Sequence, residues 1–444
     1  MDILTVGAAL GGTAWNVFFF ILALSVIVFV HEYGHYIVGR WTGIHAEVFS
    51  LGFGPVLWSR RDKRGTQWQV AAIPFGGYVK FLGDADASSV TAGDTAGLSA
   101  AEKRHTMQGA PLWARSLTVA AGPVANFILS FVILIGLLLA FGVPRDEPVV
   151  ASVRAYPFEG PSLQPGDVIV AIEGRATPDA EAFSAAVKDL PVKRVMDYSV
   201  KRGDQVLEVG GPQLDAPIVG SVAIRSAALD AGLQEGDVIL TMDGQEIGTF
   251  LQLRGIVQGS GGKPLPMTIW RDGKTFELSL TPRVRTIEDE NGVLVDRYQI
   301  GIVSSLAFEF EVRNVGVWEA ISLSGQQMAG IFSGTFSGLW HIVTGQISNC
   351  NLSGAIGMAE SIGDAARIGV QSLIFLMAVM SLGVGVLNLF PIPVLDGGHL
   401  VFHAYEAVLR RPPPERALRV MMTVGLTLVI SVMLFALSRD LICV

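Results

Sequence analysis

The residues most able to do chemistry in this sequence form a His-Glu-x-x-His motif at His31, Glu32 and His35. On a helix, His31 and His35 lie one turn apart and point the same way, so two imidazoles can hold one metal ion. Glu32 is not needed as a ligand and can accept a proton from a water that the metal activates. The motif therefore predicts two zinc ligands and the base of a hydrolase.

The surroundings of the motif are apolar, because the sixteen residues from Trp15 to Val30 carry no charge. Half of the 444 residues are hydrophobic, 16% are charged and the mean hydropathy is +0.47. These values predict a polytopic α-helical membrane protein. No Lys or Arg precedes Arg40, so we expect the first apolar segment to be a retained membrane helix rather than a cleaved signal peptide.

Other composition features narrow the class of protein. The net charge of −8 argues against a nucleic-acid partner. Cys350 and Cys443 are far apart, which predicts neither a disulfide framework nor a cysteine metal site.

A hydrolytic zinc site needs a third protein ligand and one open position. Asp396, His399 and His403 are the candidates, since all three follow the third apolar segment. A carboxylate at membrane depth is costly unless it is paired or bound to metal, so we favour Asp396. His399 and His403 could form a second pair by spacing, but no acidic residue follows the first of them. We expect His399 to have a supporting or structural role.

Two further features concern the first half of the chain. Residues 56–58 and 67–71 flank a polar turn at 61–65, which predicts a β-hairpin. Asn126 lies within the second apolar segment, and we expect it to make an interhelical hydrogen bond.

The region between the second and third apolar segments contains an internal repeat. Ser162–Ile169 recurs seventy residues later as Gly232–Ile239, and each copy continues to an acidic residue followed by Gly. The repeat predicts two copies of one β-rich module. The pattern resembles the PDZ domains of bacterial proteases, although Ser162 stands where Gly is usual. PDZ domains bind extended peptides at a sheet edge; alternatively, the modules are steric bulk or assembly surfaces.

Charge predicts the orientation in the membrane. Residues 39–115 carry nine basic and six acidic side chains, whereas residues 145–310 carry 16 basic and 24 acidic ones. The basic segments 39–115 and 398–416 are expected in the cytoplasm, and the repeat is expected outside. His31, His35 and Asp396 then share one depth, toward the cytoplasmic side.

These observations divide the chain into nine segments. They are the first membrane helix with the motif (1–38), a cytoplasmic-side loop with a membrane-associated β-hairpin (39–115), the second membrane helix (116–143), PDZ domain 1 (145–213), PDZ domain 2 (214–285), a linker with membrane-surface helices (286–370), the third membrane helix with its Pro-x-Pro and Asp-Gly residues (371–397), a cytoplasmic link (398–416) and the fourth membrane helix (417–438).

Taken together, the motifs are similar to those of the site-2 protease family, and the resemblance covers nearly the whole chain. The matching motifs are His31-Glu32-x-x-His35, Gly52-Phe53-Gly54, Gly122-Pro123-x-x-Asn126, the tandem PDZ-like repeat, and Asn388-x-x-Pro391-x-Pro393-x-Leu395-Asp396-Gly397. The resemblance implies Zn²⁺ held by His31, His35 and Asp396, with Glu32 as the catalytic base. It implies substrate contacts from Asn388, Gly52, Phe53, Gly54, Pro391 and Pro393, and a β-sheet that engages the unwound substrate.

The same resemblance implies an activity, a location and partners. The activity is regulated intramembrane proteolysis in the bacterial inner membrane as part of a stress response, with periplasmic PDZ domains and the lipid bilayer as surroundings. Implied substrates are transmembrane segments, such as an anti-sigma factor already trimmed by a periplasmic protease, or signal-peptide remnants. A PDZ-bearing membrane scaffold with a structural zinc site is the alternative function. A zinc transporter is disfavoured, because the sequence has one ligand cluster and no inverted repeat.

Overall fold

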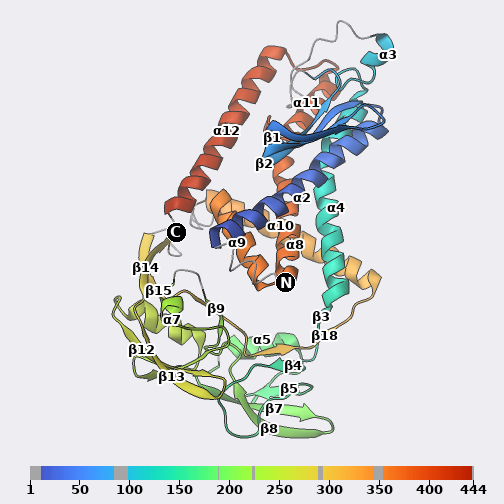
Figure 1. Cartoon of the computed structure of the whole chain (residues 1–444). Coiled ribbons are helices and arrows are strands. Elements are labelled where there is room, and N and C mark those ends of the chain that lie inside the picture. Colours follow the sequence, from blue (N-terminus) through green and yellow to red (C-terminus); the bar gives the residue numbers. More distant parts are fainter. Residues whose placement is uncertain are drawn as a thin grey trace. The chain divides into compact units, whose positions relative to one another are not determined.

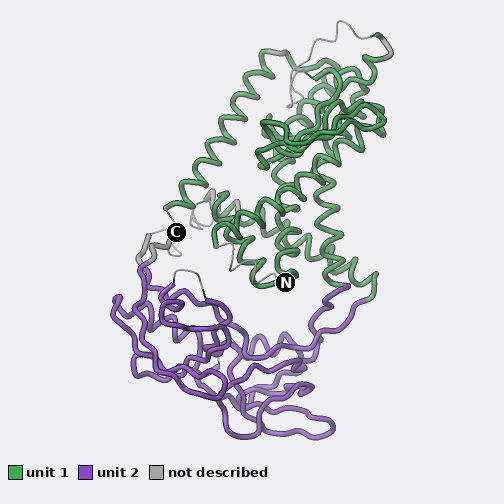
Figure 2. The backbone as a smooth tube through the Cα atoms, viewed as in Figure 1, with its two compact units in different colours: residues 1–138, 316–442 green, residues 139–315, 443–444 purple. Residues whose placement is uncertain are grey.

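The computed structural model describes residues 12–84, 99–188, 190–222, 226–288, 294–344 and 354–442. Cys350 and Cys443 lie outside these residues. The chain forms two units, one of residues 1–138 and 316–442 and the other of residues 139–315 with 443–444 (Figure 2). Each unit has its own core.

Among the described residues of the first unit, four helices are long and apolar enough to cross a membrane. They are α2 (Gly12–Trp41), α4 (Leu112–Phe141), α10 (Val370–Asn388) and α12 (Glu415–Ile442) (Figure 1). Their side chains are largely exposed and apolar, which suits contact with lipid rather than with water. The prediction of four long apolar helices is confirmed.

Three further helices of this unit pack with them: α8 (Val317–Val343), α9 (Ala355–Ile368) and α11 (Asp396–Leu409). Polar contacts hold α9 against its neighbours. The Trp15 indole of α2 donates to the Gly363 carbonyl at 3.1 Å. Asp440 of α12 accepts hydrogen bonds from the backbone at the N-terminus of α9. Each contact satisfies a polar group that lipid cannot.

The first unit also contains the predicted hairpin, built from β1 (Ala46–Arg61) and β2 (Gln67–Phe81). The turn lies between Arg61 and Gln67, as expected. Both strands bend sharply, so that residues 46–51 pair with 77–81 on one side and with 67–70 on the other. The bend of β1 passes through Gly52 and Gly54, whose φ angles of 90° and 82° favour glycine. The result is a sheet of four short segments.

The second unit consists of two sheets with the same strand order. The first contains β5 (Val168–Ile172), β6 (Arg175–Ala176), β7 (Val195–Arg202) and β8 (Gln205–Pro212), in the order β6-β5-β7-β8. The second contains β10 (Val238–Met242), β11 (Gln245–Glu246), β12 (Leu265–Arg271) and β13 (Lys274–Leu280), in the order β11-β10-β12-β13. Each has a helix between its second and third strands, α5 (Ala180–Lys188) or α7 (Phe250–Gly259). The internal repeat in the sequence is therefore a repeat of the fold.

Shorter strands close the second unit where the chain leaves it. β16 (Ile302–Ser304) pairs with β9 (Val219–Val222), β17 (Phe308–Phe310) with β4 (Val150–Val153), and β18 (Val312–Arg313) with β3 (Val143–Pro144). The chain therefore leaves the second unit antiparallel to the segment by which it entered, with β17 and β18 paired to β4 and β3. The remaining elements are α3 (Ala100–Lys103), α6 (Ala227–Asp230), β14 (Arg283–Glu288) and β15 (Leu294–Gln299).

The Gly-Asp step of each repeat carries the same buried ion pair. Asp167 accepts from Arg202 Nε and Nη2 at 2.7 and 2.8 Å, and Asp237 accepts from Arg271 at 2.6 and 2.7 Å. Both carboxylates are at most 1% exposed. A backbone N–H three residues earlier, that of Gln164 or Gln234, donates to the same carboxylate. In each repeat, the ion pair thus holds the turn before the Gly-Asp residues against the end of a strand, β7 in the first and β12 in the second.

We expect Asp237→Ala to lower the free energy of unfolding of the second unit by about 1.5–3 kcal/mol, because it removes the hydrogen bonds that the buried carboxylate accepts from Arg271 and from the Gln234 N–H. The matched control is Glu246→Ala, which breaks the exposed Arg194–Glu246 pair at 3.4 Å and should cost less than about 1 kcal/mol. Pulse proteolysis of the full chain in urea, read at cleavages within 139–315, measures both. Equal effects of the two substitutions would contradict the prediction.

Candidate metal centre

Three potential ligands converge between α2 and the first residue of α11. His31 Nε2 and His35 Nε2 lie 3.2 and 3.5 Å from Asp396 Oδ2, and 3.2 Å from each other. Within the described residues, the group able to hold a metal contains these three side chains and neither His399 nor His403. The structure thus brings together the three residues that the sequence analysis favoured.

The donor set suits zinc. Ligand atoms about 2.0–2.1 Å from a tetrahedral zinc lie about 3.3 Å apart, which matches the observed spacing. Asp396 Oδ2 is buried, and among the described residues it makes no hydrogen bond of good geometry. A buried carboxylate oxygen that accepts no hydrogen bond is costly, and a cation between the three side chains would remove that cost. Two imidazoles and one carboxylate also leave one position open.

The segment between α10 and α11 determines where Asp396 lies. α10 ends at Asn388, and Asp396 is the first residue of α11, where the helix dipole favours a carboxylate. The connecting segment contains Pro391 and Pro393 and folds tightly over the start of α11. A Cβ at Gly397 would come within 2.3 Å of the Leu389 carbonyl oxygen, so this packing needs glycine.

One face of α4 orients the two imidazoles. His35 Nδ1 lies 2.8 Å from the carbonyl oxygen of Thr118, so it carries the proton and leaves the Nε2 lone pair toward Asp396. His31 Nδ1 lies 3.2 Å from the Asn126 amide, which confirms the predicted interhelical hydrogen bond. Asn126 Oδ1 is buried with no partner among the described residues. Turning this amide over would let Oδ1 accept from His31 Nδ1–H, as Thr118 does from His35.

Gly122 lies on the same face of α4, one turn from Thr118 and one from Asn126. A Cβ at Gly122 would come within 2.3 Å of His35 Nε2 and 2.9 Å of His31 Cε1. The missing side chain is therefore what makes room for the two rings. Gly122 and Asn126 were part of a recognised motif, but Thr118 acts through its backbone, so its residue type carried no signal.

Glu32 lies beside the edge of the β-sheet. A Cβ at Gly77 would be 3.1 Å from Glu32 Cγ, so this strand passes close to the glutamate. Glu32, the three potential ligands and Asn388 line one cavity of about 1070 Å³, together with Gly77, Tyr78, Val79 and Phe81. The unpaired side of the segment 77–81 thus borders the same cavity as the metal site.

Five other predicted substrate-contact residues lie outside the lining of this cavity. Gly52, Phe53 and Gly54 form the bend of β1, where the Phe53 ring stacks on Tyr78 at 6.0 Å between centroids. Pro391 and Pro393 shape the segment before α11. These five residues therefore lie in β1 and in the segment between α10 and α11, next to elements that border the cavity. Their role in substrate contact stays a prediction.

A polar stripe on α11 extends from Asp396 along the cavity through His399, His403 and Glu406. Arg115 of α4 donates to both Glu406 oxygens at 2.7 and 3.1 Å. His403 Nδ1 lies 3.2 Å from the Ser116 hydroxyl. The sequence offered no sign of this Arg115–Glu406 pair, because its members are 291 residues apart.

Comparisons with known proteins agree with this geometry. The family model Peptidase family M50 matches residues 19–432. A chain from Agrobacterium fabrum, named as a zinc metalloprotease, is 35% identical over 98% of both chains. The regulator of sigma-E protease of Escherichia coli is 34% identical over 96% of this chain and 98% of its own, and that of Salmonella typhimurium is 33% identical over the same shares.

We expect Gly122→Ala to weaken zinc binding by at least tenfold, because the added methyl group must push the His35 and His31 rings apart. Gly136→Ala on the same helix is the matched control, since nothing lies within 4 Å of its added Cβ. Zinc content after dialysis against graded chelator concentrations measures both. Wild-type zinc retention in Gly122→Ala would show that the rings are not held against α4 in this way.

Proposed function

Because this chain belongs to peptidase family M50, the site-2 protease family of zinc metalloproteases, we propose that it cuts the transmembrane segments of other membrane proteins. The convergence of His31, His35 and Asp396 beside Glu32 carries the proposal. His31, Glu32 and His35 lie toward the end of α2, an apolar helix long enough to cross a membrane, and Asp396 begins the helix that follows α10, another such helix. Such a position exposes the site to a membrane-embedded substrate rather than to a soluble one.

The proposed roles follow from the chemistry of each side chain. His31, His35 and Asp396 would hold Zn²⁺, which supplies Lewis-acid polarisation of the scissile carbonyl and lowers the pKa of water. Glu32 would take the proton of the attacking water and deliver it to the leaving amine. Asn388, which lines the same cavity, would donate a hydrogen bond to the carbonyl oxygen as negative charge develops there.

A transmembrane substrate must be unwound before it can be cut, since a helix hides its peptide bonds in its own hydrogen bonds. The edge segment 77–81 supports a way to hold the unwound form. It pairs with residues 46–51 on one side, and it borders the cavity beside Glu32. We propose that an extended substrate adds to this edge as a further strand, with Gly52, Phe53 and Gly54 maintaining the bend of the sheet.

The location and partners are also proposals. We propose that the chain lies in the bacterial inner membrane, as its similarity to site-2 proteases implies. The charge distribution supports placing residues 145–310 on the periplasmic side and the metal site toward the cytoplasm. The two repeated modules would be PDZ domains that act as a size filter, admitting only membrane proteins whose outer domain another protease has removed. Anti-sigma-factor-like proteins and signal-peptide remnants are the proposed substrates.

We expect Glu32→Gln to retain zinc and to lower cleavage by about 10²–10⁴-fold, because the ligands remain while the base is lost. Glu47→Gln, which changes a carboxylate paired with Lys80 outside the cavity, is the control and should cleave normally. Membrane proteomics of cells carrying each variant identifies fragments that accumulate with Glu32→Gln alone. A membrane scaffold with a structural zinc site would show no difference between the two variants.

Deletion of residues 146–285 tests the size filter. We expect the shortened chain to cleave substrates that still carry their outer domain, which the intact chain rejects. A substrate already trimmed serves as the control, because its cleavage shows that the shortened chain is folded and active. If the shortened chain cut the trimmed substrate and left the intact one uncut in cells, the filter proposal would be wrong.

A further inference from the structure

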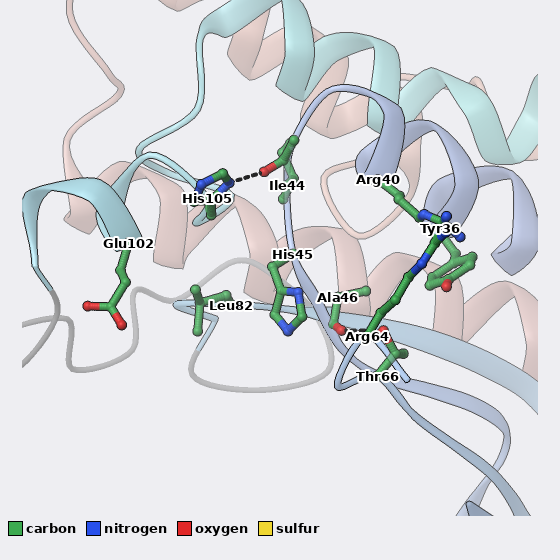
Figure 3. Close-up of a pocket in the computed structure, with 11 residues that line it drawn as sticks. Tyr36, Arg40, Ile44, His45, Ala46, Arg64, Thr66, Leu82, Glu102 and His105 are labelled. Carbon is green, nitrogen blue, oxygen red and sulfur yellow. Dashed lines mark hydrogen bonds between the residues drawn. The ribbon is translucent and has the colours of Figure 1, made fainter. Parts of the chain in front are cut away.

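A second cavity, of about 420 Å³, lies in the first unit at the C-terminal end of α2 (Figure 3). Its polar lining is mostly basic: Arg40, His45, Arg64 and His105 face one carboxylate, that of Glu102. We call it the Arg40–Arg64 pocket. It shares no lining residue with the cavity that holds Glu32 and the three potential metal ligands.

Among the described residues, the two guanidinium groups have no acidic partner. Figure 3 shows the side chains of Arg40 and Arg64 extending to the same side of the pocket, next to Tyr36, with Glu102 on the opposite side. Neither Arg40 nor Arg64 forms an ion pair within the part of the chain that the structure describes. The nearby Asp62 carboxylate is occupied by the backbone N–H groups of Arg64 and Thr66. Two cations on the same side of one pocket repel each other, so an anionic ligand between them would be favoured.

The carbonyl groups at the C-terminal end of α2 do not act as the anionic partner of Arg40 and Arg64. Ile44 N–H donates to the Gly39 carbonyl and Gly43 N–H to the Arg40 carbonyl, with φ at Gly43 of 87°. This is a Schellman motif, which satisfies the last carbonyls of the helix. The Thr42 hydroxyl also donates to the carbonyls of this last turn. The carbonyls are therefore engaged locally, and Glu102 contributes the one carboxylate among the described residues that line the pocket.

Two further polar groups of the pocket, on His105 and Tyr36, could bind a ligand. His105 Nδ1 lies 2.6 Å from the Gly43 carbonyl oxygen and must donate to it, which leaves Nε2 free. The Tyr36 side chain is 4% exposed, and its hydroxyl makes no hydrogen bond within the described residues. Backbone hydrogen bonds join His45 to His105 and to Leu82, so the pocket wall is tied together before any ligand arrives.

The position along α2 points to the source of the anion. The thirty residues of α2 are about 45 Å long, more than the ~30 Å of a bilayer's hydrocarbon core, so this end reaches the headgroup region. Trp41, next to Arg40, is 74% exposed, as is typical of a side chain that anchors a helix at the membrane surface. Phosphate is the anion that surrounds a helix end at this depth.

We propose that the Arg40–Arg64 pocket binds a phosphate group, and that the headgroup of an anionic phospholipid supplies it. The guanidinium groups of Arg40 and Arg64 would bind the phosphate oxygens, for which their planar donor arrangement is suited. His105 Nε2 and the Tyr36 hydroxyl are the further groups within the pocket that could contact the headgroup. A lipid held here would join the end of α2 to the turn of the β-sheet that borders the metal site.

Native mass spectrometry of the full chain, titrated with phosphatidylglycerol or phosphatidylcholine, tests the proposal. The test variant is Arg40→Gln with Arg64→Gln. The matched control is Arg60→Gln with Arg61→Gln, which removes the same two charges at exposed residues of β1 outside the pocket. We expect phosphatidylglycerol to bind the test variant at least tenfold more weakly than wild type, about 1.4 kcal/mol, and the control to bind as wild type does.

The outcomes separate the two sources of phosphate. Preference of the wild type for phosphatidylglycerol over phosphatidylcholine, undisturbed by millimolar inorganic phosphate, supports the lipid headgroup. Binding of inorganic phosphate that depends on Arg40 and Arg64, with no preference between the lipids, would overturn the lipid as its source. Equal phosphatidylglycerol binding by the test and control variants would overturn the site itself. Hydrogen exchange across 36–82 verifies that both variants keep the fold.

Discussion

The close packing of α4 against the C-terminal third of α2 is the contact on which the metal centre depends. A Cβ at Gly34 would come within 2.4 Å of the Ala121 carbonyl oxygen, and a Cβ at Gly122 would overlap the His35 ring. Between membrane helices there is little hydrophobic driving force, so small residues that allow close approach provide much of the association. The approach that holds the helices together also brings Thr118 and Asn126 within hydrogen-bond distance of the two histidines.

The metal centre belongs to a larger set of polar groups that satisfy one another across helices. Ser381 of α10 donates to the Asn126 carbonyl, which links the third apolar helix to the face of α4 that orients His31. Arg115 of α4 and Glu406 of α11 form a bidentate pair further along the same cavity. Groups of this kind are costly in lipid unless they are partnered. The polar groups around Asp396 therefore also fix where α11 lies relative to α4.

The β-sheet connects the metal centre to the end of α2. Its segment 77–81 borders the cavity beside Glu32, while its turn contributes Arg64 to the basic pocket. Both features depend on the sharp bends in β1 and β2, because a straight hairpin would not pair residues 46–51 on both sides. One short sheet thus contributes to both the metal-site cavity and the Arg40–Arg64 pocket.

From the residues alone, the main elements and the side chains able to hold a metal could be predicted. The charge-free run before His31 identified a membrane helix, the spacing of His31 and His35 indicated a metal pair, and the Gly-Asp repeat indicated two β-rich modules. These features are local, because they depend on helical or strand periodicity and on residue type. Asp396 could also be predicted as the third ligand, because a carboxylate at membrane depth requires a partner.

Tertiary structure alone decided how these pieces meet. Thr118 contributes a backbone carbonyl that any residue could supply, and Arg115 and Glu406 are separated by most of the chain, so neither has a local signal. The bends that turn one hairpin into four paired segments depend on pairing between residues far apart on the same strands. The meeting of Arg40 and Arg64 depends on where a helix end and a strand turn are brought together in space. Residue type and spacing specify what a side chain can do, whereas packing between distant segments decides which side chains can act together.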